Sequence, residues 1–546
     1  MSAPERAALT ATHTSPSNIC RTLRICAPGG VAIKYDAPCI KNENFPTLPA
    51  VKAVGLGIAG AVVSVLAFPP FGPGWLILIG ITLFLLGLAL ASSRLQGLFI
   101  GTVYGVAFFA GLIWWISELG LVALVPLVLL QAAFPAAYGW WLARYNDRPP
   151  GVWPVLAVGG WVIMELIRYR FPFGGFEWGG AGNALSDQTW ARDGASLIGA
   201  SGWTVIVVAV AVSLVLLIQG ERGRWLWVAP IVAVLVVLGG LPGRLSSVNG
   251  VAGKSVVIIQ GSTPCPFEHC PPDERLRTFE QHLALTMMIA PGEADLVVWS
   301  EGSTGGANAD PVQNPEIGQA IGEQARRIGA WMLVGSDRRL SDTEWINANV
   351  VFNPDGEIVG EYRKQHPVPF GEYIPFRPLF DWIPALAQVP RDMIPGEGPV
   401  IFDLETFELG SVISFEGSFS RYAREHVRAG AGVIVVATNE GSYSTTPASE
   451  QLIGMTRMRA AELRVPVVHS AVTGRSTVID SSGAIVSDVS GLGTQQIITG
   501  TINPRGGSLY AIVGDVFFYI AAFAGVLMWW RARSLVGSGD RFLEEE

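Results

Sequence analysis

Long apolar blocks separated by short polar loops dominate the first half of the chain. Seven blocks approach 20 residues, the length at which an apolar helix crosses the hydrocarbon core of a bilayer. They lie at about 51–69, 73–91, 97–117, 119–143, 152–168, 196–218 and 224–241, and an eighth lies at about 509–530. Residues 1–50 are rich in Ser, Thr, Pro and Ala without an amphipathic period, which predicts a disordered leader. The pattern therefore predicts eight transmembrane helices after a leader.

A segment with the pattern of an ordinary globular α/β domain, at 246–506, separates the seventh block from the eighth. Short β-branched runs there predict buried strands, at 255–259, 296–299, 331–335, 411–413, 433–437, 467–470 and 476–480. Two further strands, 349–353 and 357–362, are expected to pair across a Pro-Asp-Gly turn. Helices are expected at 272–290, 315–328 and 452–463. The alternation predicts an α/β sandwich, and the absence of a GxGxxG motif opening a helix argues against a dinucleotide-binding fold.

Basic residues in the short loops predict which side of the membrane holds this domain. They fall on alternate loops, which contain Arg94, Arg144, Arg148, Arg222 and Arg224, and also on the leader and the C-terminal tail. Short basic loops stay in the cytoplasm. Seven spans therefore place residues 246–506 outside the cytoplasm, and the eighth span, within 507–546, brings the C-terminal tail back into it. The loop 169–193 departs from the rule with Arg170 and Arg192, and its run FPFGGFEWGG is typical of a membrane interface beside a site.

Composition narrows the function classes. Of the 546 residues, 50% are apolar and 15% are charged, and the net charge is −8 without any basic tract, which argues against a nucleic-acid partner. The five cysteines form no metal-binding pattern. The predicted spans hold few charges beyond Glu165 and Arg168, which argues against a transporter.

Three polar residues each follow a predicted strand of the globular domain. Glu301 lies in VVWSEG, Lys364 lies in EYRKQHPVPFGEYIP, and Ser414 lies in LGSVISFEGSFS. A strand that ends in a turn can present one side chain to a cleft from a rigid base. Taken singly, each residue is more simply a surface carboxylate, a surface lysine or a turn serine.

Together these residues resemble the Glu-Lys-Cys triad of the nitrilase, or carbon-nitrogen hydrolase, superfamily. The flanking spans make the chain similar to the apolipoprotein N-acyltransferase family. The matching motifs are VVWSEG at 297–302, YRKQHPVPFGEYIP at 362–375 and TRMRAAE at 456–462. The resemblance covers about residues 51–530. It implies a nitrilase-like α-β-β-α sandwich inserted in an eight-helix transmembrane bundle of a bacterial cytoplasmic membrane.

The resemblance also implies a reaction that needs no cofactor and no metal. A nucleophile takes an acyl chain from a membrane phospholipid and passes it to the N-terminal amine of a diacylglyceryl-cysteine lipoprotein. By the same resemblance, Glu301 is the general base, Lys364 supports the oxyanion, Glu372 orients the lysine or the amine, and Glu416 lies beside the nucleophile. Acyl transfer needs an activated nucleophile and a positive group where negative charge develops. The protein would act as a monomer or as the partner of a homologue.

Two positions depart from the family pattern. Ser414 stands where the family has its cysteine, and no cysteine follows Cys270. An alcohol is a far weaker acid than a thiol, whose pKa is near 8.5. Asn439 is followed by Glu-Gly-Ser-Tyr, where the family commonly has an aromatic NDxWFG turn. Three interpretations remain open: an engineered Cys-to-Ser form, a natural enzyme with a slow serine nucleophile, and an inactive homologue that binds lipid or lipoprotein.

Two further hypotheses concern the globular domain. An amidase acting on soluble substrates would have no need of eight spans, and assays with lipid donors against soluble amides would distinguish the two activities. Cys265 and Cys270 flank a short loop on the side expected to be oxidising. They could form a disulfide if their Cα atoms approach to about 4.4–6.8 Å, and the alternative is two free thiols.

Overall fold

The computed structural model describes residues 22–26, 32–36, 48–147, 151–245, 253–263, 272–380, 382–443 and 445–539. Contacts divide the chain into two units, 1–52 and 53–546. The first unit contains an antiparallel pair of short strands, β1 (Thr22–Cys26) and β2 (Ala32–Asp36), which the composition of the leader does not predict. Cys265 and Cys270 lie outside the described residues, so their pairing stays a prediction.

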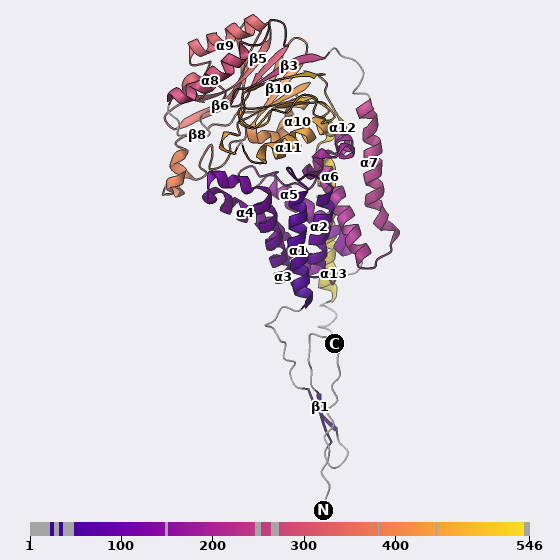
Figure 1. Ribbon diagram of the computed structural model, residues 1–546. Coiled ribbons are helices and arrows are strands. Elements are labelled where there is room, and N and C mark those ends of the chain that lie inside the picture. The colour runs from indigo at the N-terminus through magenta and orange to yellow at the C-terminus, as the bar shows by residue number, and fades with distance from the viewer. Residues whose placement is uncertain are drawn as a thin grey trace, which may run out of the picture. The chain divides into compact units, whose positions relative to one another are not determined.

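Eight helices of 14 to 30 residues lie along the eight predicted blocks (Figure 1). They are α1 (Leu48–Leu66), α2 (Leu76–Ala89), α3 (Arg94–Leu112), α4 (Leu121–Leu142), α5 (Val152–Arg168), α6 (Thr189–Ile218), α7 (Val228–Leu245) and α13 (Val516–Gly539). Among the described residues, four helical segments have the length and apolar composition to cross a membrane: Arg94–Leu112, Leu121–Tyr145, Thr189–Ile218 and Val516–Arg533. Three shorter apolar helices are Ala50–Leu66, Leu76–Ala89 and Val228–Leu241.

Glycines allow two pairs of these helices to approach closely. A Cβ atom added at Gly97 of α3 would lie 2.3 Å from the backbone oxygen of Gly139 in α4. A Cβ atom added at Gly159 of α5 would lie 2.4 Å from the Cα atom of Gly525 in α13. Small residues are common where apolar helices associate within lipid. Because the hydrophobic effect does not drive helices together there, close packing has to do so.

The globular part contains two mixed sheets. The larger has the order β14-β3-β4-β5-β6-β7, with β8 also paired to β6, and the smaller has the order β13-β12-β11-β10-β9. The larger sheet consists of β3 (Lys254–Gln260), β4 (Leu296–Trp299), β5 (Trp331–Arg339), β6 (Glu344–Phe352), β7 (Ile358–Arg363), β8 (Asp392–Met393) and β14 (Gln496–Ile502). The smaller consists of β9 (Ile401–Asp403), β10 (Glu408–Ile413), β11 (Val433–Thr438), β12 (Val467–Ala471) and β13 (Thr477–Ile479).

Helices cover the outer faces of both sheets. Buried residues of β3, β4, β10 and β11 form one core between the sheets. Residues of α8 (Pro272–Thr286) and α9 (Pro315–Ile328) pack on the outer face of the larger sheet. Residues of α10 (Ser420–Arg428), α11 (Ala448–Leu463) and α12 (Leu509–Val513) pack on the smaller one. The predicted α-β-β-α sandwich is therefore present.

Helix α11 joins the sandwich to the apolar helices (Figure 1). Its residues Ala460 and Leu463 belong to the core over the smaller sheet. Its residues Leu452, Met455 and Met458 belong to the core of the apolar helices. Because its apolar residues face both cores and its buried residues also include Gln451, Arg459 and Glu462, α11 shows no single amphipathic stripe in the sequence.

Candidate functional site

Lys364 lies immediately after β7 and is fully buried. Its Nζ atom lies 2.5 Å from Oε1 of Glu372 and 3.4 Å from Oε1 of Glu301. Burial alone would lower the pKa of this ammonium, but the carboxylates of Glu372 and Glu301 more than compensate, so the pKa of Lys364 is raised. The site therefore holds a fixed positive charge away from solvent, where an electrostatic interaction is stronger than in water.

Glu301 lies just beyond the end of β4, in a turn that its neighbour makes possible. Gly302 has a φ of +68°, a conformation that side chains rarely adopt. Besides Lys364, Oε1 of Glu301 accepts a hydrogen bond of 2.7 Å from Nδ2 of Asn347 in β6. Its Oε2 accepts one of 2.7 Å from the backbone N–H of Asn439, after β11. The carboxylate is thus held by groups from both sheets.

Glu372 lies in the loop that follows Lys364. Its Oε2 accepts a hydrogen bond of 2.7 Å from the backbone N–H of Val368, while Oε1 faces Lys364. Burial raises the pKa of Glu372 although the ammonium of Lys364 opposes the shift. The arrangement fixes the ammonium between two carboxylates, which agrees with an orienting role for Glu372.

Glu416 is a buried link between β10 and the segment after Lys364. Its Oε2 accepts from the backbone N–H of Ile413 and from the hydroxyl of Tyr362, both at 2.8 Å. Its Oε1 accepts from the backbone N–H groups of Gln365 at 2.6 Å and His366 at 2.9 Å. Burial raises the pKa of Glu416 to about 7 against the effect of these donors. Four donors on one carboxyl indicate a positioning residue rather than a free acid.

Ser414 begins a turn of 3₁₀ helix, Ser414–Ser418, directly after β10. It is half-buried and has a φ of +55°, which is a strained conformation for a residue with a Cβ atom. β10 is a central strand between β9 and β11, so this turn has a rigid base. Strain at a strand-to-helix turn is one way in which a fold presents a nucleophile.

The structure brings Glu301, Lys364 and Glu372 into direct contact and ties Ser414 to them through the backbone. Ile413 precedes Ser414 and donates to Glu416, which also binds the backbone next to Lys364. Ile413 also pairs with Ala437, two residues before the Asn439 amide that binds Glu301. Within the part of the chain that the structure describes, Ser414 Oγ forms no hydrogen bond to Glu301 or Lys364.

The sequence alone does not identify three residues that hold the site in place. Asn347 and Asn439 hold Glu301, and Tyr362 holds Glu416. Asn347 offers one signal, because it and Asn349 are the two polar residues of an otherwise apolar run, WINANVVF. The contributions of the Asn439 amide and of Tyr362 depend on tertiary pairing and leave no local signal.

His366 is a weak base in its surroundings. Its Nδ1 atom lies 2.8 Å from the hydroxyl of Tyr422, and its ring packs on Phe415 and Phe419. Burial, reinforced by the charges of Arg421 and Lys364, lowers the pKa of His366 to about 3. The imidazole is therefore neutral at physiological pH.

Aromatic rings from the loop between α5 and α6 reach the residue next to Ser414. The ring centroids of Phe176 and Trp178 lie 5.7 Å and 6.4 Å from that of Phe415. Tyr443, in the turn after Asn439, lies 4.9 Å from Trp115. The two departures from the family pattern, Ser414 and the turn after Asn439, thus both adjoin this aromatic group.

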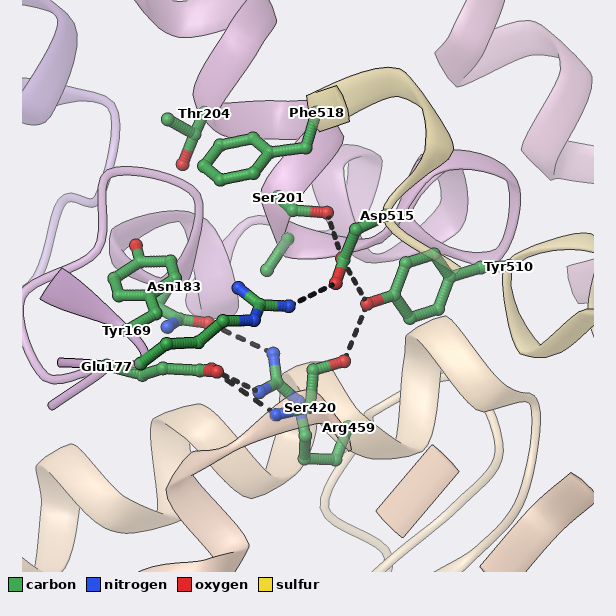
Figure 2. Close-up of a pocket in the computed structure, with 12 residues that line it drawn as sticks. Tyr169, Glu177, Asn183, Ser201, Thr204, Ser420, Arg459, Tyr510, Asp515 and Phe518 are labelled. Atoms are coloured by element: carbon green, nitrogen blue, oxygen red, sulfur yellow. Dashed lines mark hydrogen bonds and ion pairs between the residues drawn. The ribbon is translucent and has the colours of Figure 1, made fainter. Parts of the chain in front are cut away.

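A polar cavity of about 20 Å³ lies between the sandwich and the apolar helices. Figure 2 shows Arg459 and Glu177 facing one another across it, with Ser420, Tyr510 and Asp515 in a chain of hydrogen bonds. Arg459 also forms an ion pair with Glu462 at 2.8 Å, so two charged residues of the motif TRMRAAE belong to this cluster. This cluster links the two parts of the molecule at a distance from Lys364. Among the described residues, no three His, Cys, Asp or Glu side chains form a metal site.

Comparison with known proteins gives matches over both parts. Residues 60–213 match the apolipoprotein N-acyltransferase N-terminal domain, and residues 260–510 match the carbon-nitrogen hydrolase family. The chain is 28% identical to the apolipoprotein N-acyltransferase of Geobacter metallireducens, over 89% of this chain and 96% of that one. It is 29% identical to that of Caulobacter vibrioides, over 85% and 91%. A carbon-nitrogen hydrolase from Helicobacter pylori G27 shows 16% identity over 46% of this chain and 89% of its own, with a TM-score of 0.34.

Proposed function

Because the chain belongs to the apolipoprotein N-acyltransferase family of the carbon-nitrogen hydrolase superfamily, we propose that it transfers an acyl chain from a membrane phospholipid to a lipoprotein. The acceptor is the N-terminal amine of a diacylglyceryl-cysteine. The proposal is carried by one observation, the buried ammonium of Lys364 held between the carboxylates of Glu301 and Glu372. The eight apolar helices are proposed to span the membrane, with the sandwich on its extracytoplasmic side.

In the first step, Ser414 Oγ attacks the carbonyl carbon of a phospholipid ester. Glu301 takes the hydroxyl proton, and the negative charge that develops on the carbonyl oxygen is stabilised by Lys364. The tetrahedral intermediate collapses, the ester C–O bond breaks, and the lysophospholipid alcohol leaves with the proton from Glu301. The acyl chain is then joined to Ser414 as an ester.

In the second step, the neutral amine of the lipoprotein attacks the same carbonyl carbon. Glu301 takes a proton from the amine, and Lys364 again stabilises the oxyanion. The bond to Ser414 Oγ breaks, the proton returns to Ser414, and an amide remains on the lipoprotein. Glu416 and Glu372 position the reacting groups and exchange no proton in this scheme.

The serine itself favours a second candidate function, that of a homologue which binds lipid or lipoprotein without turnover, alone or beside an active enzyme. A serine nucleophile usually relies on a histidine base with an orienting partner. His366 is held neutral by its surroundings, but its Nδ1 atom faces Tyr422. Ser414 therefore depends on a carboxylate, which is a weak base for an alcohol.

Mass spectrometry of the purified protein after incubation with phospholipid distinguishes the two functions. An acyl adduct on Ser414 that disappears in Glu301→Gln supports the transferase. The variant Ser414→Cys should raise adduct formation by several factors of ten, each worth about 1.4 kcal/mol of barrier, because a carboxylate can ionise a thiol more easily. A Ser414→Cys protein that reacts with a small thiol reagent but never with phospholipid would refute the transferase and favour the binding function.

A further inference from the structure

A single glutamine of α11 forms hydrogen bonds to three separate segments of the apolar-helix part. Gln451 is buried, with 4% of its surface exposed. Its Oε1 atom accepts from the indole Nε1–H groups of Trp178 at 2.7 Å and Trp115 at 3.2 Å. Its Nε2 atom donates to the backbone oxygens of Pro69 and Leu112, both at 3.1 Å. Every hydrogen-bonding position of the amide is therefore used outside its own helix.

The two indoles that Gln451 holds are the rings that adjoin the candidate site. Their centroids lie 5.3 Å apart. Trp115 lies 4.9 Å from Tyr443, in the turn that begins at the Glu301-binding Asn439. Trp178 is stacked 6.4 Å from Phe415, the neighbour of Ser414. One amide thus fixes two aromatic rings, of which one packs beside the turn after Asn439 and the other beside Phe415.

The chemistry of an indole makes this link specific in orientation. A buried indole N–H needs an acceptor, since leaving it unpaired costs the desolvation of a polar group. Trp115 and Trp178 share one acceptor oxygen, so neither ring can rotate away without losing it. The amide in turn cannot shift, because its two donors are fixed by the backbone after α1 and at the end of α3.

An acyl chain on Ser414 has to leave the charged pair Glu301–Lys364 on an apolar side, and Trp178 packs together with Phe176 and Phe419 around Phe415, the neighbour of Ser414. We propose that Gln451 is a positioning residue that fixes Trp115 and Trp178 and thereby sets the acyl-chain length that the site accepts. This inference rests on the proposed function and names the residue that governs its substrate selectivity.

The test compares phospholipids that differ only in chain length. Full-length protein in detergent is titrated with phosphatidylethanolamines bearing dodecanoyl, palmitoyl or stearoyl chains, in competition with a fluorescent phospholipid. The wild-type protein is expected to prefer one length. In Gln451→Leu the ratio of dissociation constants between the preferred length and the others should fall by about fourfold, the discrimination that one methylene group supplies.

The matched control is Gln260→Leu. Gln260 is also fully buried and uses its amide fully, but its partners, Ser476, Ser490, Gly491 and Thr494, all belong to the sandwich. A structural loss of a buried glutamine should appear equally in both variants, whereas the length preference should change only in Gln451→Leu. Equal changes in the two variants, or an unchanged preference in Gln451→Leu, would overturn the inference.

Trp178→Phe gives a second route if Gln451→Leu does not fold. It keeps an aromatic ring beside Phe415 and removes the N–H that Gln451 binds, so it should weaken the length preference in the same direction; an unchanged preference counts against the inference. A wild-type protein that binds phospholipid with no length preference refutes the role of Gln451 alone. A wild-type protein that binds no phospholipid refutes the proposed function and this inference with it.

Discussion

The ammonium of Lys364 lies between two buried carboxylates, so the charges of this group stabilise one another. Glu301 and Glu372 both face Nζ, and Lys364 is 1% exposed. Removing one partner of a buried ion pair leaves an uncompensated charge and typically costs about 3–5 kcal/mol. The effect on stability and the effect on chemistry can therefore be separated by changing one residue or two.

We expect Lys364→Met to lower the thermal unfolding temperature of the sandwich and to abolish acyl-adduct formation. In the double variant Lys364→Met with Glu372→Gln, the excess buried charge is reduced, so much of the stability should return. Adduct formation should stay absent because the positive charge for the oxyanion is missing. Calorimetry and mass spectrometry measure the two properties. A single variant as stable as the double one would contradict the charge argument.

A second prediction at the residue scale concerns Glu440, which lies beside Asn439. Burial, reinforced by the carboxylates of Glu450 and Glu301, raises the pKa of Glu440 to about 7. The folded protein then binds a proton between pH 4.5 and 7 that the unfolded chain releases. Stability should be full at the acidic end of this range and fall by about 3 kcal/mol as the pH rises to 7.

Glu440→Gln should remove this loss, because the amide does not titrate. The measurement is the unfolding temperature of the sandwich across the pH range, and Glu397→Gln, which changes an exposed carboxylate, is the control. A pH profile of Glu440→Gln parallel to that of the wild-type protein would show that burial does not raise the pKa of Glu440.

Sequence reasoning at this scale identifies residues that end strands but not those that hold them. Glu301 and Lys364 stand out because each follows a predicted strand within a recognisable motif, and the structure brings them into contact. The backbone N–H of Asn439 has no signature in the sequence. Its contact with Glu301 depends on how the two sheets pack together, and the two residues lie far apart along the chain. The catalytic role of Ser414 stays a prediction.

At the scale of elements, apolar periodicity predicts the central strands and the long helices well. β4 and α9 have the predicted bounds, and β10 extends the expected run by three residues toward its N-terminus. The pattern gives no sign of β9, β14 or α10, and it merges α12 with α13 in the eighth apolar block. β9 and α12 are too short to show a period, and β14 mixes apolar, polar and glycine residues because it pairs only with β3, at the edge of the sheet.

The contact between α3 and α4 supplies the element-scale prediction. Gly97→Ala places a methyl group within 2.3 Å of a backbone oxygen that cannot yield without moving α4. We expect a loss of about 1–3 kcal/mol from overpacking, seen as a lower unfolding temperature in detergent. Gly55→Ala is the control, since a Cβ atom there meets nothing within 4 Å. Because alanine is the better helix former, that variant should be neutral or slightly more stable, and equal destabilisation of both would refute the packing argument.

At the scale of the molecule, the sandwich and the apolar helices form one unit joined through α11. The order of the parts along the chain could be predicted from hydropathy alone, because the globular segment interrupts a series of apolar blocks. The junction could not. It consists of single polar residues, such as Gln451 and Arg459, whose partners lie hundreds of positions earlier in the sequence.

The side of the membrane that the sandwich occupies is the last prediction, and it follows from the basic loops. The test uses a protein whose five cysteines are replaced by serine and to which one cysteine is returned at an exposed position, in Asp355→Cys or in Glu221→Cys. Asp355 lies in the turn between β6 and β7, and Glu221 in the loop between α6 and α7. Because short basic loops stay in the cytoplasm, a membrane-impermeant thiol reagent should label Asp355→Cys in intact cells. It should label Glu221→Cys only after the membrane is opened. The reverse result would place the site on the cytoplasmic side, where a lipoprotein amine exposed outside the cell membrane could not reach Ser414.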